Sequence, residues 1–304
     1  MAKRYHGPDA ISNRSNLIIQ LIFWLYTCCC ILPLLLIVAV SFSDEKQVLI
    51  HGYSFIPEQW SLDAYRFLFK DYMQIIRSYG ISFLVTIAGT ILSVIIMSLY
   101  AYPISRRDFP HRNFFSLFVF FTMLFNGGLV PFYLVYTQVL NLKNTLPALI
   151  VPYLVQAFFV LLLRTFFTNS VPAALIESAK IDGASELRIF TSIIIPLSLP
   201  VLATVALFQT MHYWNDWFLS LIFISDERNV NLQFLMYKTL MNIQFLAQNA
   251  DAAAEAQANG AVFNFPTETV RMAMAVIGVG PIVFAFPFFQ RYFVQGLTVG
   301  AVKG

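Results

Sequence analysis

Long apolar stretches are the feature that most constrains the fold of this 304-residue chain. A transmembrane helix needs about 20 predominantly apolar residues, and six stretches approach or exceed that length: 17–40, 80–104, 114–139, 146–167, 197–224 and 272–293. Charged residues make up only 12% of the chain, whereas soluble domains carry about 25%. The sequence therefore predicts an all-α integral membrane protein with six transmembrane helices.

The segments between and within these stretches differ in character. We expect residues 42–79 to form a loop with short surface helices and residues 225–271 to form a long polar loop. The third stretch contains residues that interrupt helices: Asn126, Gly127, Gly128 and Pro131. Such breaks are tolerated where they line protein or water. Asn126 therefore either lines a pathway or lies where helices pack closely through small residues.

Basic residues predict the orientation in the membrane. When the loops are assigned alternately to the two sides, 11 of the 19 Lys and Arg residues fall on the side of both termini. Short cytoplasmic loops are enriched in Lys and Arg, and the turn 106–112 is the clearest example. We therefore expect a cytoplasmic segment at 1–16, a transmembrane domain at 17–294 with a cytoplasmic loop at 169–196, and a cytoplasmic tail at 295–304. The first stretch is too long for a signal peptide, so we expect it to remain as an anchor.

Residues that carry chemistry are sparse. The four histidines are scattered, and Cys28, Cys29 and Cys30 are consecutive in one apolar stretch, so we expect no metal site. The formal charge of +3 shows no nucleic-acid footprint. The sequence lacks a Gly-rich phosphate-binding loop. We expect no catalytic residues and no bound cofactor in this chain, and any ATP hydrolysis has to come from a partner protein.

The most informative polar segment runs from Pro172 to Pro200. Pro172 suits the first turn of a helix, and residues 173–181 are good or tolerable helix formers. Gly183 can adopt the left-handed conformation that commonly follows a last helical turn. Ser185 can cap a second helix that begins at Glu186. The segment therefore predicts a short helix, a glycine turn and a longer helix that enters the membrane.

The same segment resembles the signature loop of permease subunits of bacterial ABC importers. The matching positions follow the family spacing, with Ser178 in place of Ala and Ile195 in place of Leu: Glu177, Ser178, Ala179, Gly183, Ile193, Ile195 and Pro196. In that family the loop forms a coupling helix that docks on a separate ATPase. The resemblance implies that six residues couple this chain to an ATPase: Glu177, Ser178, Ala179, Asp182, Gly183 and Pro196. The alternative is an ordinary amphipathic loop in which Glu177 pairs with Lys180 on the helix surface.

The C-terminal run 288–304 resembles the tail of maltose-type and complex-oligosaccharide permeases, and the run 214–218 resembles their Trp-Asn segment. This resemblance implies a subunit of a binding-protein-dependent sugar importer in the bacterial cytoplasmic (inner) membrane. Its expected partners are a second related permease, two ATPase subunits that hold ATP and Mg, an extracytoplasmic solute-binding protein, an oligosaccharide and membrane lipid. Transport would proceed by alternating access.

Four residues of the fifth stretch are candidates for contact with the sugar: Gln209, Tyr213, Asp216 and Ser220. Their spacing places them on one face of a helix. Carboxylates and amides accept hydrogen bonds from hydroxyl groups, and aromatic rings cover the apolar faces of sugars. The alternative places Asp216 at the outer membrane interface, where Trp214 and Trp217 form an aromatic belt.

Three other functions are alternatives to a sugar importer subunit. An ion-coupled secondary transporter should carry several intramembrane charges and an inverted repeat, and neither is clear here. An ABC permease for a non-sugar solute fits the coupling loop but not the C-terminal resemblance. A membrane scaffold without a transport role has no need of a glycine-punctuated docking loop.

Overall fold

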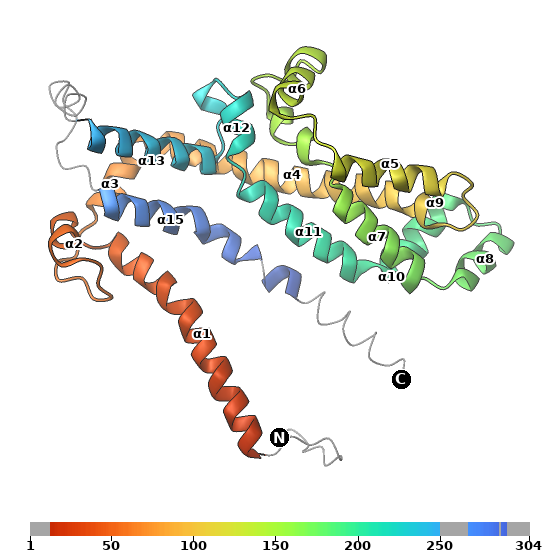
Figure 1. Cartoon of the computed structure of the whole chain (residues 1–304), viewed down its shortest axis with the longest axis horizontal. Helices are drawn as coiled ribbons and strands as arrows, with labels where there is room; N and C mark the ends of the chain where they lie inside the picture. Colours follow the sequence, from red (N-terminus) through yellow and green to blue (C-terminus); the bar gives the residue numbers. More distant parts are fainter. Residues whose placement is uncertain (1–12, 250–266, 286, 291–304) are drawn as a thin grey trace. The chain divides into compact units, whose positions relative to one another are not determined.

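The structure is a computed structural model that describes residues 13–249, 267–285 and 287–290 (Figure 1). These residues are helical or irregular, apart from one isolated β-bridge between Ser43 and Trp60. This confirms the predicted all-α fold class. The chain divides into two compact units, Met1–Lys70 with Ile243–Ile277 and Asp71–Asn242 with Gly278–Gly304, which are described separately. Residues 1–12 of the expected cytoplasmic segment 1–16 and the whole expected tail 295–304 lie outside the described residues, and residues 13–16 belong to the first helix.

The first unit contains the expected N-terminal anchor. Helix α1 (Asn13–Ser41) includes Pro33 without ending there, and its portion Ser15–Ser41 is long and apolar enough to cross a membrane. Helix α2 (Glu45–His51) begins where the Asp44 side chain accepts hydrogen bonds from two backbone N–H groups. Helix α3 (Asp63–Leu68) follows. The expected short surface helices are therefore present.

The second unit holds most of the remaining helices and both candidate sites. In chain order after η1 (Phe69–Asp71), the elements are α4 (Tyr72–Ser105), α5 (Arg112–Leu124), α6 (Leu129–Leu134), η2 (Val135–Val139), η3 (Leu146–Leu149), η4 (Val151–Tyr153), α7 (Ala157–Ser170), α8 (Ala173–Ile181), α9 (Glu186–Ile189), η5 (Phe190–Ile194), α10 (Ile195–Leu197), α11 (Leu199–Trp214), α12 (Phe218–Phe223) and η6 (Glu227–Asn229). Two further helices contribute residues to both units: α13 (Leu232–Gln248) and α15 (Thr267–Val283).

Helix α4 begins eight residues before the expected start of the second span at residue 80. The Asp71 side chain accepts a hydrogen bond from Gln74 N at 3.3 Å and so caps the helix at this earlier point. The capped helix absorbs residues 72–79, which we expected in the preceding loop. It then packs against α11 and α7 (Figure 1).

Three of the expected spans are bent. The chain turns by 116° between α5 and the α6–η2 segment, by 50° before α7 and by 81° before α11. The first bend confirms the predicted break, because Gly128 has a φ of 86° and its N–H donates to the Asn126 side chain at 2.8 Å. With each bent pair taken as one span, the described residues contain up to five spans. The expected sixth span, 272–293, coincides in part with α15, which has 17 residues.

The expected polar loop 225–271 contains helix α13 and the start of α15, so that expectation was wrong over residues 232–248 and 267–271. Asn231 caps α13, since its side-chain oxygen accepts the Phe234 N–H at 3.0 Å. Leu232, Met236 and Ile243 are buried, and their spacing places them on one helical face. The signal for this helix is an apolar stripe in an otherwise polar segment, which the length of apolar stretches alone does not reveal.

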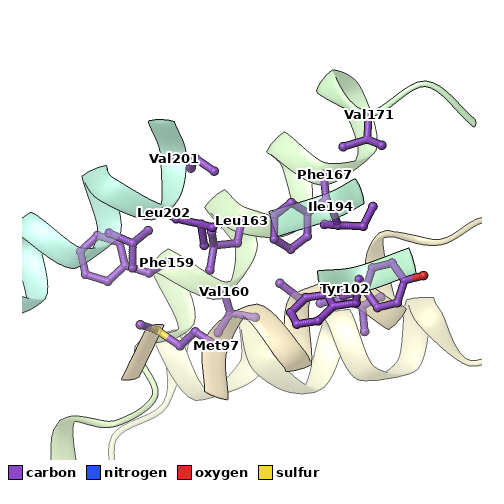
Figure 2. Close-up of a cluster of buried hydrophobic side chains, with 14 of the residues drawn as sticks. Met97, Tyr102, Phe159, Val160, Leu163, Phe167, Val171, Ile194, Val201 and Leu202 are labelled. Carbon is purple, nitrogen blue, oxygen red and sulfur yellow. The ribbon is translucent and has the colours of Figure 1, made fainter. Parts of the chain in front are cut away.

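A hydrophobic cluster between α4 and α7 positions the loop that follows α7 (Figure 2). Met97 and Tyr102 of α4 lie against Val160 and Leu163 of α7, all of them buried. Phe167 continues this contact towards the end of α7. Because the side chains interdigitate, the end of α7 has a fixed place relative to α4.

Candidate functional site

The loop 169–196, which we call the coupling loop after the role expected from the resemblance, folds as its sequence predicts. Helix α8 follows Pro172 and ends at Ile181, and Gly183 adopts a φ of 78°. The Gly183 N–H donates to the Lys180 carbonyl at 3.0 Å and the Ala184 N–H donates to the Ala179 carbonyl at 2.9 Å. These two bonds form a Schellman motif, which satisfies the last carbonyls of the helix. Pro172 occupies the N-cap position rather than the first turn.

The second helix of the loop also begins as predicted. Ser185 caps α9, because its side-chain oxygen accepts the Arg188 N–H at 3.4 Å. Two capped helices joined by one left-handed glycine leave little freedom in the turn. The loop therefore has a fixed helix–turn–helix conformation rather than an irregular one.

Helix α8 has an inner and an outer face. Ile176 is buried, and Ala179 is half-buried against the hydrophobic cluster. Glu177, Ser178 and Asp182 are exposed. Ala179 therefore supports the helix from within, whereas the other three side chains are available to a partner.

Glu177 makes no ion pair with any residue in the described part of the chain. The alternative interpretation, in which Glu177 pairs with Lys180, is wrong for this structure, because Lys180 Nζ lies 2.8 Å from Asp108 and 2.9 Å from Glu186. A carboxylate without an internal partner is free to meet a basic group of another protein.

The outer face of the loop also carries apolar side chains that are not part of the resemblance to the signature loop. Ile181 is 86% exposed at the end of α8, and Leu187 of α9 is 67% exposed. Ile181 lies four residues after Glu177 on α8, so an apolar side chain and a carboxylate share the outer face of this helix. The signal in the sequence was two isolated apolar residues in a polar turn.

Pro196 has a different place from the other predicted coupling residues. It lies in α10, immediately before the 81° bend that leads into α11. The Ser198 N–H donates to the Ile194 and Ile195 carbonyls at 3.0 and 3.1 Å, which closes the turn. Pro196 therefore shapes the entry into the membrane helix and is not part of the exposed face of α8.

The four predicted sugar-contacting residues do not form one helical face, because α11 ends at Trp214, Asp216 follows it and Ser220 lies on α12; most of their surface is packed inside this chain. Gln209 is 0% exposed and accepts a hydrogen bond from Gln156 Nε2 at 3.2 Å. Tyr213 is 2% exposed, and its hydroxyl donates to the Ile150 carbonyl at 2.9 Å. Ser220, also buried, accepts the Asn231 N–H at 3.4 Å. The four residues do share an environment, but three of them are held by neighbouring helices.

Asp216 differs from the other three residues because it also borders a cavity. Its carboxylate accepts the Leu219 N–H at 3.3–3.4 Å and the Tyr153 hydroxyl at 3.1 Å. Asn231 donates to its backbone carbonyl. Asp216 therefore accepts hydrogen bonds at the start of α12 and borders the cavity at the same time.

The cavity beside Asp216 has a volume of about 430 Å³ and is lined by polar and aromatic side chains: Gln156, Phe159, Phe208, Met211, His212, Asn215, Asp216 and Trp217. The α11 residues that line it, Phe208, Met211 and His212, lie on the helical face next to the one that carries Gln209 and Tyr213. Sequence reasoning missed Gln156 and His212 as candidates and assigned Trp217 to the membrane interface. Helical spacing identified which residues share a face, but not which face the protein leaves open.

The cavity wall is held in place by ring contacts. Trp217 stacks on Tyr237 with a centroid distance of 4.4 Å and an interplanar angle of 19°. The His212 ring meets Tyr153 edge-on at 4.2 Å. Amide, imidazole and carboxylate groups beside a supported aromatic ring are the mixture that binds hydroxyl-rich ligands.

Asn126 lies elsewhere and does not line this cavity. Its side chain accepts the Gly128 N–H at the break between α5 and α6. Among the described residues, no three His, Cys, Asp or Glu side chains are close enough to hold a metal ion.

Comparison with known proteins agrees with this geometry. Residues 104–299 match the family model described as "Binding-protein-dependent transport system inner membrane component". The chain is 37% identical over 275 residues to the polygalacturonan/rhamnogalacturonan transport system permease protein YtcP of Bacillus subtilis, covering 90% of this chain and 93% of that protein. It is 30% identical over 278 residues to the arabinooligosaccharides transport system permease protein AraQ of Halalkalibacterium halodurans, covering 90% and 91%.

A solved structure shows the same fold over nearly the whole chain. A chain of a bacterial ABC transporter involved in the import of the acidic polysaccharide alginate aligns with a TM-score of 0.76 and 26% identity, covering 93% of this chain and 99% of that chain. The family match extends over the coupling loop and the cavity helices alike. This chain belongs to the binding-protein-dependent transport system inner membrane components, the permease subunits of ABC importers.

Proposed function

We propose that this chain is the membrane-spanning permease subunit of an ATP-driven importer that carries an oligosaccharide across the bacterial cytoplasmic membrane by alternating access. It works with a second related permease, two ATPase subunits and an extracytoplasmic solute-binding protein. ATP and Mg bind to the ATPase subunits, and this chain carries no cofactor of its own. The sugar assignment is supported by the relatives, whose names specify polygalacturonan or rhamnogalacturonan, arabinooligosaccharides and alginate.

The observation that carries the proposal is the preformed coupling loop with an exposed outer face. Glu177 and Ile181 present a charge and an apolar side chain on a helix that the Gly183 turn holds fixed. Burying an isoleucine side chain in a partner contributes about 2 kcal/mol, which corresponds to about a 30-fold change in affinity. The outer face of α8 therefore supplies a sizeable part of the contact with an ATPase.

Substitution of Ile181 tests this docking role. We expect Ile181→Asp to reduce recovery of the ATPase subunits with the tagged chain, while the amount of chain in the membrane is unchanged. Ile56→Asp is the matched control, because Ile56 is 80% exposed in the expected extracytoplasmic region. Equal ATPase recovery from the two variants would contradict the docking role.

The proposed orientation places α8 and both termini in the cytoplasm. Lys180 Nζ lies 2.8 Å from the Asp108 carboxylate, so the basic turn 106–112 is on the same side as α8. That turn is the strongest cytoplasmic signal in the sequence. Labelling with a membrane-impermeant thiol reagent tests this, after Cys28–Cys30 are changed to Ser and one cysteine is placed at Arg107. Labelling in intact cells would contradict the orientation.

We propose that the sugar passes along the cavity bordered by Asp216, His212 and Trp217. We expect Asp216→Asn to lower uptake of the transported sugar severalfold in proteoliposomes that contain the whole complex. The asparagine oxygen can still accept the Leu219 and Tyr153 hydrogen bonds, so assembly should be retained. Asp226→Asn is the matched control, since Asp226 also caps a helical segment but lies outside the cavity.

The probes for this assay follow from the relatives' substrates: oligogalacturonate, oligoalginate and an arabino-oligosaccharide. Unchanged uptake of every transported probe by Asp216→Asn would remove Asp216 from the pathway. Transport of a non-sugar solute in place of all three would favour the alternative ABC permease function.

An ion-coupled secondary transporter fits the structure less well. Asp216 is the one acidic or basic side chain that the described part of the chain buries. Proton- and ion-coupled transporters use chains of intramembrane charges. Uptake that persists in ATP-free vesicles with an imposed ion gradient would support this rival.

A further inference from the structure

Five charged and polar side chains meet where α4 ends and the coupling loop begins: Tyr102, Arg106, Asp108, Lys180 and Glu186. We call them the junction cluster. Arg106 binds Asp108 through two nitrogens, Nε at 2.9 Å and Nη2 at 2.7 Å. Lys180 Nζ bridges Asp108 at 2.8 Å and Glu186 at 2.9 Å. The cluster therefore joins the α4–α5 turn to both helices of the coupling loop.

A third link ties the cluster to α4 itself. The Tyr102 hydroxyl donates to Glu186 Oε2 at 2.6 Å and accepts a hydrogen bond from Arg106 Nη1 at 3.1 Å. The Tyr102 ring is buried in the hydrophobic cluster that joins α4 to α7. Charge-assisted bonds of this kind are directional, so they fix angles between helices as well as distances.

The electrostatics of the cluster keep its acidic and basic side chains charged, while Tyr102 stays neutral and donates its hydroxyl proton to Glu186. The hydrogen bond from Arg106, followed by the one from Lys180, holds the pKa of Asp108 well below its usual range. The hydrogen bond from Tyr102 lowers the pKa of Glu186, and the bond to Asp108 raises the pKa of Lys180. None of the charged members becomes neutral near physiological pH, so the cluster is a permanent link and not a pH switch.

Stability alone does not explain the cluster. The side chains of Lys180, Asp108 and Glu186 are 38%, 54% and 57% exposed, and exposed ion pairs add little to folding stability because solvent screens them. Yet Lys180 turns away from Glu177 on its own helix to reach groups on α9 and on the α4–α5 turn. What this arrangement adds is a fixed angle between α8 and α4.

We propose that Asp108 and Lys180 are positioning residues for energy coupling, which hold α8 and α4 together as one rigid body. This inference rests on the proposed function: when the ATPase subunits move α8, the junction cluster passes that displacement to α4. Without the cluster, α8 would tilt within the loop and part of the displacement would be lost.

The far end of this rigid body reaches the cavity. On α4, Met97 lies five residues before Tyr102, and its sulfur accepts the Gln156 N–H at 3.5 Å. Gln156 lines the cavity and donates to Gln209 of α11. A rotation or shift of α4 therefore acts directly on a residue of the cavity wall, through contacts that are all present in the structure.

The test measures how much ATP the complex consumes for each sugar that it imports. The whole complex is reconstituted in proteoliposomes with its binding protein, and ATP hydrolysis and uptake of a transported probe sugar are recorded together. We expect Lys180→Gln and Asp108→Asn each to raise ATP consumed per sugar by about threefold to tenfold, the effect of losing one or two ion pairs. Asp108→Asn keeps the shape of the side chain, and Lys180→Gln puts a shorter polar side chain at a partly exposed position, so the complex should still assemble.

Three further variants distinguish coupling from a general defect. Lys180→Arg should keep the wild-type ratio, because a guanidinium can bind both carboxylates. The double variant Asp108→Asn, Lys180→Gln should have a smaller effect than the product of the two single effects, because the Lys180–Asp108 ion pair is already lost in each single variant. Arg107→Ala should also keep the wild-type ratio, since Arg107 is in the same turn but makes no ion pair with a described residue.

The outcomes separate this inference from the proposed function. Assembled single variants with the wild-type ratio would overturn the inference and leave the function intact, and so would a double variant whose effect is the product of the two single effects. Wild-type complex that hydrolyses ATP without importing any sugar probe would overturn the proposed function, and the coupling inference with it.

Discussion

Two long helices of the second unit approach closely at Gly89 of α4, which faces the Tyr213 ring of α11. A Cβ atom added at Gly89 would lie 2.6–2.8 Å from three ring atoms of Tyr213. The ring cannot easily move away. Its hydroxyl is bonded to the Ile150 carbonyl at 2.9 Å and lies 3.2 Å from Ser93 Oγ. We therefore expect Gly89→Ala to destabilise the protein.

The size of the effect follows from these contacts. Forcing one extra carbon into a packed interior costs about 1–3 kcal/mol. If the ring is displaced as well, one buried hydrogen bond is lost, which adds about 1 kcal/mol. The higher helix propensity of alanine offsets about 1 kcal/mol, so the expected loss of stability for Gly89→Ala is about 1–3 kcal/mol.

The assay is thermal stability of the detergent-solubilised complex, followed by the loss of its monodisperse chromatographic peak. Gly80→Ala is the matched control on the same helix, because no atom lies within 4 Å of the added Cβ, and alanine favours a helix over glycine by about 1 kcal/mol. Tyr213→Leu in the Gly89→Ala background removes the clashing ring, so the double variant should be more stable than the sum of the single effects predicts. Equal stability of Gly89→Ala and Gly80→Ala would refute the reasoning.

Three further outcomes are expected. Gly183→Val should abolish ATPase stimulation by the binding protein while membrane levels hold, because its φ of 78° is strained for a β-branched residue even though nothing lies within 4 Å of the added Cβ; stimulation in Gly183→Asn should be retained in part. Glu45→Gln should lower the thermal stability, because the carboxylate accepts the Glu268 and Thr269 N–H groups at 2.9 Å at the start of α15; Glu58→Gln is the exposed control. ATP consumed per sugar should stay constant between about pH 5 and about pH 9. Because the pKa of Asp108 is depressed, its carboxylate stays charged and keeps its ion pairs until the pH falls below about 4. Because the pKa of Lys180 is raised, its ammonium group stays charged and keeps its ion pairs until the pH rises above about 10.

The coupling loop was predictable from sequence because its signals are local. Pro172, Gly183 and Ser185 act through backbone geometry and capping, which depend on neighbours only a few residues away. The structure confirms the end of α8 at Ile181 and the start of α9 at Glu186. The same locality explains why the break after Asn126 was foreseen.

The cavity was harder to predict because helical periodicity identifies a face but not its surroundings. Gln209 and Tyr213 share a face of α11, which other elements of the chain cover, whereas Ser220 lies on α12 because α11 ends at Trp214. Which side of α11 is open depends on contacts with residues about 120 positions away, such as Ser93 with Tyr213. No local pattern in α11 carries that information.

The junction cluster was missed for a related reason. Lys180 was considered only with Glu177 on its own helix, because a spacing of three residues is what a sequence makes visible. Its actual partners are Asp108, which is 72 residues away, and Glu186 beyond the glycine turn. Ion pairs between elements need the fold before they can be identified.

Asp216 shows how two functions that the sequence presents as alternatives coexist in one residue. Its carboxylate caps α12 through the Leu219 N–H and also borders the cavity. The Tyr153 hydroxyl and the backbone donor fix its position, so on the proposed pathway an incoming sugar would meet an acceptor that is already oriented and would lose little free energy in ordering it. Asp216→Ala removes both the cap and the acceptor, whereas Asp216→Asn removes only the charge. If the cap alone matters, uptake should fall in the alanine variant together with stability and remain normal in the asparagine variant. If the charge contacts sugar, uptake should fall in both variants, and only the alanine variant should lose stability, by about 1 kcal/mol or more.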